Sequence, residues 1–172
     1  MDICDYILHD HDEQRRLFAI LDEVPRDDTD ALGVVWGRLA NLLEVHAQAE
    51  EELFYPRLLK EGKGEGGTDG PVDETLDAVG DHDDIRKGVR AASAHDVGSK
   101  EWWDAVLAAR EANDDHMGEE EREALPDFRH NSTPQERHDI GVRFAIYEAR
   151  HADGHGIDSS DRGAQAYVDA HT

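Results

Sequence analysis

Apolar residues recur along most of this chain at the three- and four-residue spacings of an α-helix. In the first such run, residues 2–24, the recurring positions are Ile3, Ile7, Phe18 and Leu21. Side chains three or four positions apart lie on one face of a helix, and the run stops at a segment that begins with Pro25. The pattern therefore predicts an amphipathic helix that ends near residue 24.

The same spacing predicts four further helices. They lie at about residues 29–58, 73–94 and 99–128, and from Thr133 through Tyr147. Thr133 opens the last one with a capping box that has proline at the first helical position. The glycine-rich segment 61–71 predicts a flexible turn. No stretch alternates with a period of two, so no sheet is expected.

Four long helices joined by short links fold most simply as an up-down-up-down bundle. We therefore expect an all-α protein, a four-helix bundle with an additional C-terminal helix, formed by residues 1–152 as one domain. A chain of 172 residues has the usual length of a single domain. Residues 153–172 are rich in Gly, Asp and Ser with little apolar periodicity, which predicts a flexible C-terminal tail.

The charge of the chain restricts its partners. It contains 41 acidic and 18 basic residues, a formal net charge of −23. Such a charge repels nucleic-acid phosphates and anionic membrane surfaces, so we expect neither as a partner. The many aspartates and few lysines indicate either a halophilic protein from a high-salt cytoplasm, where salt screens self-repulsion, or simply an acidic protein.

The single cysteine and the absence of targeting signals also limit the possibilities. Cys4 has no second cysteine to pair with, which excludes an intrachain disulfide and a thiolate metal cluster. The first residues lack a basic region and a long apolar run, so no signal peptide is expected. No stretch approaches the ~20 apolar residues of a membrane span. We expect a cytoplasmic protein.

A histidine–glutamate motif occurs twice, 70 residues apart. The copies are His46-x3-Glu50 and His116-x3-Glu120, and each histidine precedes a proline by ten residues. An Asp-His pair containing His11 or His82 stands ahead of each copy. Residues i and i+4 of a helix lie ~6 Å apart on one face, so the imidazole and the carboxylate can reach one point. The four helices could thus enclose a pair of metal ions.

Each part of this pattern also has a simpler interpretation. One histidine on an apolar face is usually a hydrogen-bonded core residue, and glutamate runs are usually solvated, so we expect four neighbouring glutamates on the surface: Glu51, Glu52, Glu119 and Glu121. The joint alternation of all four blocks favours metal binding instead. Asp10 and Asp81 are candidates to orient an imidazole, although the i−1 position is an awkward one for that role.

The order His11, His46-x3-Glu50, His82, His116-x3-Glu120 resembles the hemerythrin-like, or HHE cation-binding, domain over about residues 2–130. This resemblance implies a four-helix bundle that holds a non-haem di-iron centre with an oxo or hydroxo bridge. It also implies that the four histidines are terminal ligands and that Glu50 and Glu120 bridge two iron ions. Imidazole suits iron, and carboxylates can neutralise and bridge two cations.

The chain departs from the oxygen-carrying hemerythrins at two positions. Those proteins have His-x3-His on the third helix, whereas Arg86 follows His82 here by four residues. Their last motif is His-x4-Asp, in place of His116-x3-Glu120. One coordination position is therefore open or filled by another side chain. Tyr55 is the best candidate for a metal ligand there, and simple packing of its ring is the alternative.

These departures put oxygen storage in doubt and leave three functional readings. The first is a di-iron protein that decomposes hydrogen peroxide or reacts with another oxygen species, a catalase-like role in protection from oxidative stress. The second is a module that binds or senses O2, NO or iron without turnover. The third is a structural bundle that holds zinc. The sequence leaves open whether the protein is an enzyme.

Overall fold

The structure, a computed structural model, describes residues 1–64 and 70–172. In that part of the chain every regular element is a helix, which confirms the predicted all-α class. Residues 65–69, inside the turn predicted for 61–71, lie outside the described residues. None of the described helices is both long and apolar enough to cross a membrane.

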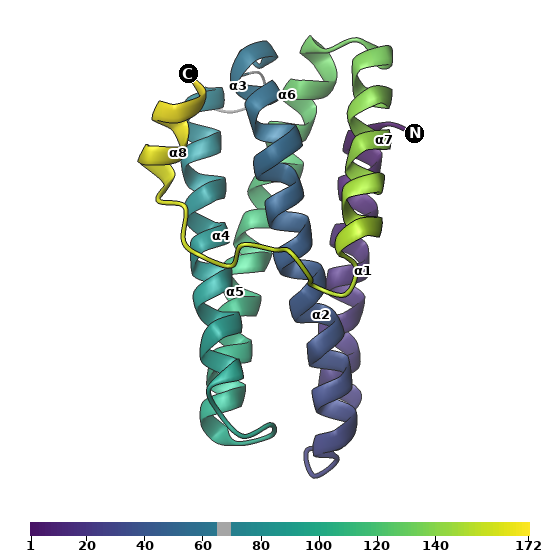
Figure 1. Cartoon of the computed structure of the whole chain (residues 1–172), viewed down its shortest axis with the longest axis vertical. Helices are drawn as coiled ribbons and strands as arrows, with labels where there is room; N and C mark the ends of the chain where they lie inside the picture. The colour runs from purple at the N-terminus through teal and green to yellow at the C-terminus, as the bar shows by residue number, and fades with distance from the viewer. Residues whose placement is uncertain (65–69) are drawn as a thin grey trace.

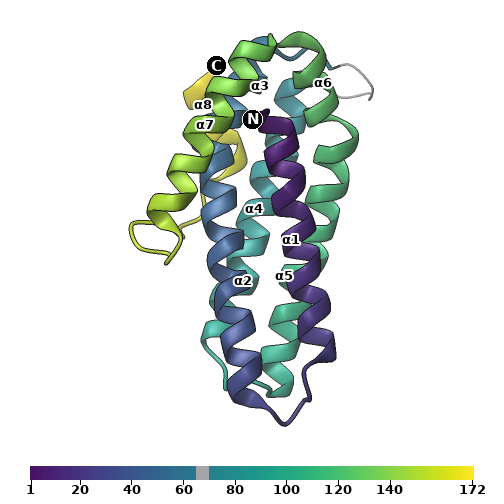
Figure 2. The ribbon, with the colours of Figure 1, turned by 90° about the vertical axis from the view of Figure 1, so that its right-hand side faces the viewer.

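Four long helices lie side by side along the length of the molecule (Figures 1 and 2). They are α1 (Ile3–Glu23), α2 (Thr29–Ala49), α4 (Pro71–Ser93) and α5 (Lys100–Arg122). The α1–α2 and α4–α5 links lie at the same end (Figure 1). Side chains of Asp2, Asp28 and Ser99 accept a backbone N–H at the starts of α1, α2 and α5, which satisfies donors that the helix leaves free.

Two prolines interrupt helices that the sequence predicted as continuous. A proline ring clashes with the carbonyl four residues earlier, so a regular helix cannot pass through it. Before Pro56 the chain forms a π-helical turn, η1 (Glu50–Phe54), and continues as α3 (Tyr55–Glu61). Before Pro126 the chain instead leaves helical geometry at Glu123 and restarts as α6 (Ala124–Asn131).

Two further helices follow the long four. The predicted fifth helix is α7 (Pro134–His151), capped by Thr133 and packed against α1 and α2 (Figure 2). In place of the loose tail expected for residues 153–172, the chain crosses over α2 and α4 and forms α8 (Ala164–His171) (Figure 1). Tyr167 and Val168 are buried where α8 packs against α4, and this contact orders a segment with almost no apolar pattern.

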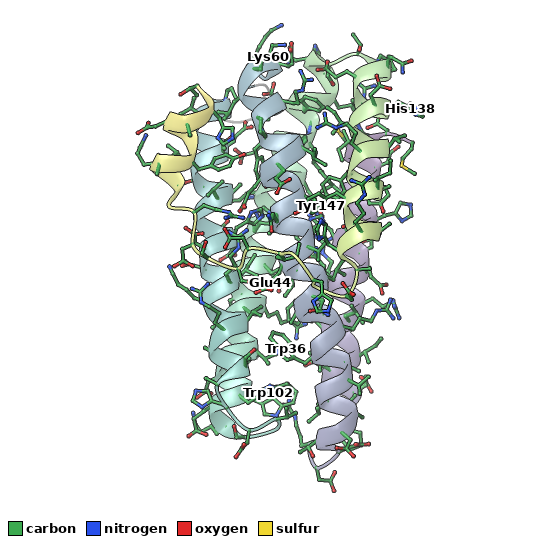
Figure 3. The ribbon with its side chains drawn as sticks, viewed as in Figure 1. Trp36, Glu44, Lys60, Trp102, His138 and Tyr147 are labelled. Carbon is green, nitrogen blue, oxygen red and sulfur yellow. The ribbon has the colours of Figure 1, made fainter. Side chains whose placement is uncertain are left out.

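The interior consists of two apolar clusters with a polar layer between them. One cluster contains Ile7, Phe54 and Val79. The other contains Trp36 and Trp102, whose ring centroids lie 6.0 Å apart in an edge-to-face arrangement in the lower part of the molecule (Figure 3). On all four long helices the histidines predicted to bind metal fall between residues of the two clusters in sequence.

Candidate metal centre

Four histidines and two glutamates meet in the polar layer, each from a predicted position. His11 comes from α1, His82 from α4, His46 with Glu50 from α2 and the start of η1, and His116 with Glu120 from α5. All six side chains are at most 3% exposed. The layer is therefore a buried cluster rather than a surface patch.

The Nε2 atoms of the histidines face the carboxylates. His46 Nε2 lies 2.9 Å from Glu50 Oε1, and His82 Nε2 lies 3.2 Å from Glu50 Oε2. His11 Nε2 lies 3.3 Å from Glu120 Oε2. The Nε2 atoms of His82 and His116 are 3.2 Å apart. Both carboxylates thus lie between the imidazoles.

Some ligand atoms of the cluster contact one another. Four buried atoms, His11 Nε2 with Glu120 Oε2 and His46 Nε2 with Glu50 Oε1, lie within 3.3 Å in pairs but form no hydrogen bond of regular geometry with any described residue. His11, Glu50, His116 and Glu120 can each place one ligand atom within 4.8 Å of the others. Because buried polar atoms are normally paired, this arrangement fits a group of bound cations that would satisfy them.

Carboxylates on the far side fix three of the imidazoles. The Nδ1 atom of His11 lies 2.9 Å from Glu121 Oε1, that of His46 lies 3.2 Å from Asp10 Oδ2, and that of His82 lies 3.0 Å from Glu51 Oε1. A carboxylate only accepts, so Nδ1 carries the proton in each ring. In the neutral ring this directs the Nε2 lone pair toward the cluster, as metal-binding histidines require.

Two expectations about these outer groups need correction. Glu51, expected on the surface, is 2% exposed, because it pairs with Arg86 and Arg162 as well as His82. Asp10 contacts His46 of the neighbouring helix rather than His11 beside it. The arginine that follows His82 therefore supports the outer layer of the cluster.

The π-helical turn directs Tyr55 toward the cluster. The Tyr55 hydroxyl donates to Glu120 Oε1 at 3.1 Å and lies 3.4 Å from Glu50 Oε2. Five residues make just over one turn of a π-helix, so Tyr55 follows Glu50 on the same face although an α-helix would rotate it away. The i+5 spacing between Glu50 and Tyr55 therefore suits a π-helical turn.

Charges inside the layer shift the pKa values strongly. Burial alone would raise the pKa of Glu50, but the imidazoles of His46, His116 and His82 hold it well below its ordinary value. Burial would lower the pKa of His82, whereas hydrogen bonds with Glu50 and Glu51 raise it to about 9. Burial and the charges of Glu120 and Glu50 raise the pKa of Tyr55, which keeps the phenol protonated in the metal-free cluster.

A small acidic pocket between α4 and α5 leads to the cluster. Its volume is about 60 Å³, and His116 and Glu120 form part of its wall. The other charged wall residues are acidic: Glu74, Asp77, Asp81, Glu119 and Glu123. Burial and the charge of Glu119 raise the pKa of Asp81 to about 6. The pocket accommodates a few water-sized molecules and is far smaller than the site of an organic ligand.

The structure brings all seven residues predicted to bind metal together, and their role as ligands stays a prediction. Sequence reasoning did not find Glu148, which extends from α7 to 3.9 Å from His46 Nδ1, or the contact of Arg162 with Glu51. Neither residue belongs to a repeated motif, and their sequence distances from these partners are large. Only the packing of α7 and of the segment before α8 reveals them.

A family model and a curated protein match this chain. The family model "Hemerythrin HHE cation binding domain" matches residues 2–128. The chain is also 26% identical over 150 residues to a curated protein named DNA nickase from Nostoc sp.. That alignment covers 87% of this chain but 40% of the relative, so the chain spans less than half of the relative's length. No solved structure matches the chain.

Proposed function

Because this chain belongs to the family of hemerythrin HHE cation-binding domains, we propose that it is a non-haem di-iron protein that reacts with peroxide or another small oxygen species. The four long helices would form the up-down-up-down bundle expected from the sequence. His11, His46, His82 and His116 would be the terminal ligands, and Glu50 and Glu120 would lie between two iron ions.

The observation that carries the proposal is the direction of the imidazoles. Three rings donate from Nδ1 to a carboxylate and turn Nε2 toward two buried glutamates. A core built only for packing has no need of outer carboxylates that hold the histidines in one tautomer. Two anionic glutamates in this buried layer would also be costly without compensating positive charge.

The pocket supports a small substrate. Its volume of about 60 Å³ suits O2, NO or hydrogen peroxide. The carboxylates on its wall disfavour anions such as superoxide and leave neutral molecules unaffected. Peroxide is therefore a better candidate than superoxide.

The residues of the site would support chemistry on peroxide in three ways. Iron, when bound, would supply an exchangeable coordination position and would accept and return electrons, so that one peroxide is reduced to water while a second is oxidised to O2. The protein's own groups bind and orient the metal, and the two apolar clusters keep bulk water out of the layer. The Tyr55 hydroxyl holds its proton 3.1 Å from Glu120 Oε1, where it would donate a hydrogen bond to that carboxylate or to a molecule beside it. Tyr55 is alternatively a direct ligand, as the sequence suggested.

Metal analysis with a visible spectrum, recorded before and after peroxide is added, tests the proposal. The wild-type protein should bind two iron ions and release O2 from peroxide. His46→Ala and His116→Ala should lose most of the metal, whereas His9→Ala, on the exposed face of α1, should retain it. A monomer that keeps both ions after either core substitution would refute the ligand assignment.

The alternative function is binding or sensing of O2, NO or iron without turnover, since the same pocket admits these molecules. Bound iron without O2 release from peroxide would favour it. Zinc at the site, with no visible absorption, would identify a structural bundle. We expect no binding to nucleic acid, because the net charge of −23 repels phosphates. The name of the Nostoc relative alone does not overturn that expectation.

A further inference from the structure

The segment between α7 and α8 is hydrogen-bonded across the face of α2 (Figure 1). The backbone N–H of Asp158 donates to Gln48 Oε1 at 2.9 Å. The Ser159 hydroxyl donates to Glu44 Oε2 at 2.9 Å. Both acceptors lie on the turns of α2 beside His46. The segment is thus held at the level of the metal centre.

Arg162 stands at the end of this segment in a fixed position. Its Nε donates to Glu51 Oε2 at 2.9 Å. The backbone N–H groups of Arg162 and Gly163 donate to the two oxygens of Asp83, at 2.7 and 2.9 Å. Gly163 has a φ of 68°, which a residue with a side chain rarely adopts. The turn that directs Arg162 toward Glu51 therefore depends on glycine.

Glu51 connects Arg162 to a histidine of the cluster. Its Oε1 lies 3.0 Å from His82 Nδ1, and its Oε2 receives the Arg162 guanidinium. Arg86 contacts the same carboxylate, but it belongs to α4 together with His82. The Tyr167 hydroxyl of α8 also donates to the backbone carbonyl of Glu51. Contacts from residues 162–167 thus fix both the backbone and the side chain of Glu51 from outside the long helices.

We propose that Arg162 is a positioning residue of the metal centre, which holds Glu51 so that His82 keeps the orientation needed to bind one of the two ions. The inference rests on the proposed di-iron function. It assigns a part in metal binding to the carboxyl-terminal segment, which lies outside residues 2–128 matched by the family.

The physical reason is that Arg86 alone would not fix the position of the Glu51 carboxylate relative to the other helices. Arg86 and His82 lie on the same helix, so their contacts with Glu51 move with that helix. Arg162 instead links Glu51 to a segment that is bonded to two helices, to Asp83 of α4 and, through Asp158, to Gln48 of α2. Loss of an outer partner of a ligating histidine typically weakens metal binding about 10–100-fold.

The test compares Arg162→Gln, which removes the charge, with Arg162→Lys, which keeps it. Arg110→Gln is the matched control, because Arg110 also makes a partly exposed ion pair, with Asp22, away from the cluster. Fe²⁺ affinity is measured without oxygen by competition with a coloured chelator. We expect Arg162→Gln to lower the affinity for one of the two ions about 10-fold and Arg162→Lys to restore most of that affinity. Arg110→Gln should change the affinity for neither ion.

Thermal unfolding with and without metal separates positioning from general stabilisation. A positioning role predicts that Arg162→Gln reduces the gain in melting temperature on metal binding. An unchanged Fe²⁺ affinity, with equal losses of stability in both forms, would overturn the inference while the proposed function stands. An equal loss of affinity for both ions would overturn the link through His82. Wild-type protein that binds no metal would overturn both proposals.

Discussion

Glu50 combines complete burial with a negative charge, and the imidazoles around it make that state tolerable. Its pKa is well below the ordinary value because His46, His116 and His82 offset the cost of burial. Glu120 is placed similarly between His11 and the Tyr55 hydroxyl. At the scale of single residues, the cluster is a balance of charges that an uncharged substitution would disturb.

Substituting glutamine for Glu50 or Glu120 tests this balance. Each change keeps the size of the side chain but removes the charge that would neutralise two cations. We expect metal affinity to fall by more than the ~10–100-fold typical of an outer partner. Glu52→Gln and Glu119→Gln are the controls, since both side chains are exposed. Equal losses in all four variants, measured by chelator competition, would contradict the bridging role.

Tyr55→Phe tests the role of the phenol. A phenolate bound to ferric iron gives a strong visible charge-transfer band, which the variant should lose while its ring still packs among neighbouring aromatics. The lost hydrogen bond to the Glu120 carboxylate should cost about 1.5–3 kcal/mol of unfolding free energy. Peroxide turnover should change as well. An unchanged spectrum and unchanged turnover would show that Tyr55 only packs.

At the scale of elements, α4 and α5 make the most extensive helix contact in the described structure. Gly88 allows this approach: a Cβ added there would lie 2.7 Å from the Cβ of Ala109 and 2.8 Å from its backbone N. Backbone cannot move aside as a flexible side chain does. The spacing of two helices that carry His82 and His116 therefore depends on one missing side chain.

Gly88→Ala should accordingly destabilise the protein by about 1–3 kcal/mol, because overpacking must separate the helices. Gly37→Ala is the opposite case, since nothing lies within 4 Å of a Cβ added on that exposed face of α2. It should stabilise by about 0.5–1 kcal/mol through helix propensity. Urea unfolding measures both changes, and a neutral Gly88→Ala would contradict the close contact.

Helix periodicity predicted much of this arrangement, because the residues concerned lie within a few turns of each other. His46 and Glu50 share a face by local geometry, and so do His116 and Glu120. The burial of Glu51 was not predictable, because its partners Arg86 and Arg162 are 35 and 111 residues away. The orientation of Tyr55 required a π-helical turn, which period-based reasoning does not contain.

At the scale of the whole molecule, titration and net charge determine how solution conditions act on stability. In the metal-free protein, burial lowers the pKa values of His11, His46 and His82, but neighbouring carboxylates more than compensate and raise them, that of His82 to about 9. Burial and the charge of Asp10 raise the pKa of Glu148 to about 7. His116 is shifted in the opposite direction, downward from 6.5.

Metal-free protein should therefore lose stability as the pH rises from 6.5 to about 9. A raised pKa in the folded state means that this state binds more protons than the unfolded chain in that window, so stability falls as the protons leave. The lowered pKa of His116 acts below pH 6.5 and does not cancel the effect. Thermal unfolding of chelator-treated protein measures it.

The stability of metal-loaded protein should fall less with rising pH, because the metal binds the deprotonated ligands and its affinity increases over the same pH range. The melting temperatures of the two forms should thus diverge between pH 6.5 and about 9. A metal-free form that becomes more stable with rising pH would contradict the charge balance of the cluster.

Salt should stabilise the protein. Raising KCl from about 0.1 M to about 1 M shortens the Debye length from about 10 Å to about 3 Å, which screens the repulsion among surface carboxylates. With a net charge of −23, that repulsion opposes compaction. The urea midpoint should rise with KCl. A falling midpoint would mean that the surface ion pairs contribute more than the repulsion, against a halophilic origin.

The π-helical turn before Pro56 determines how the insertion or deletion of one residue during evolution affects the position of Tyr55. A π-helical turn holds one residue more than a regular helical turn, and genes gain or lose residues one codon at a time. Loss of a single codon between Glu50 and Tyr55, with a return to ordinary winding, would place the tyrosine at i+4, about 40° round from Glu50, so it would stay on the same face. An inserted residue that is accommodated as a π-helical turn therefore leaves the phenol on the same face as the metal ligands.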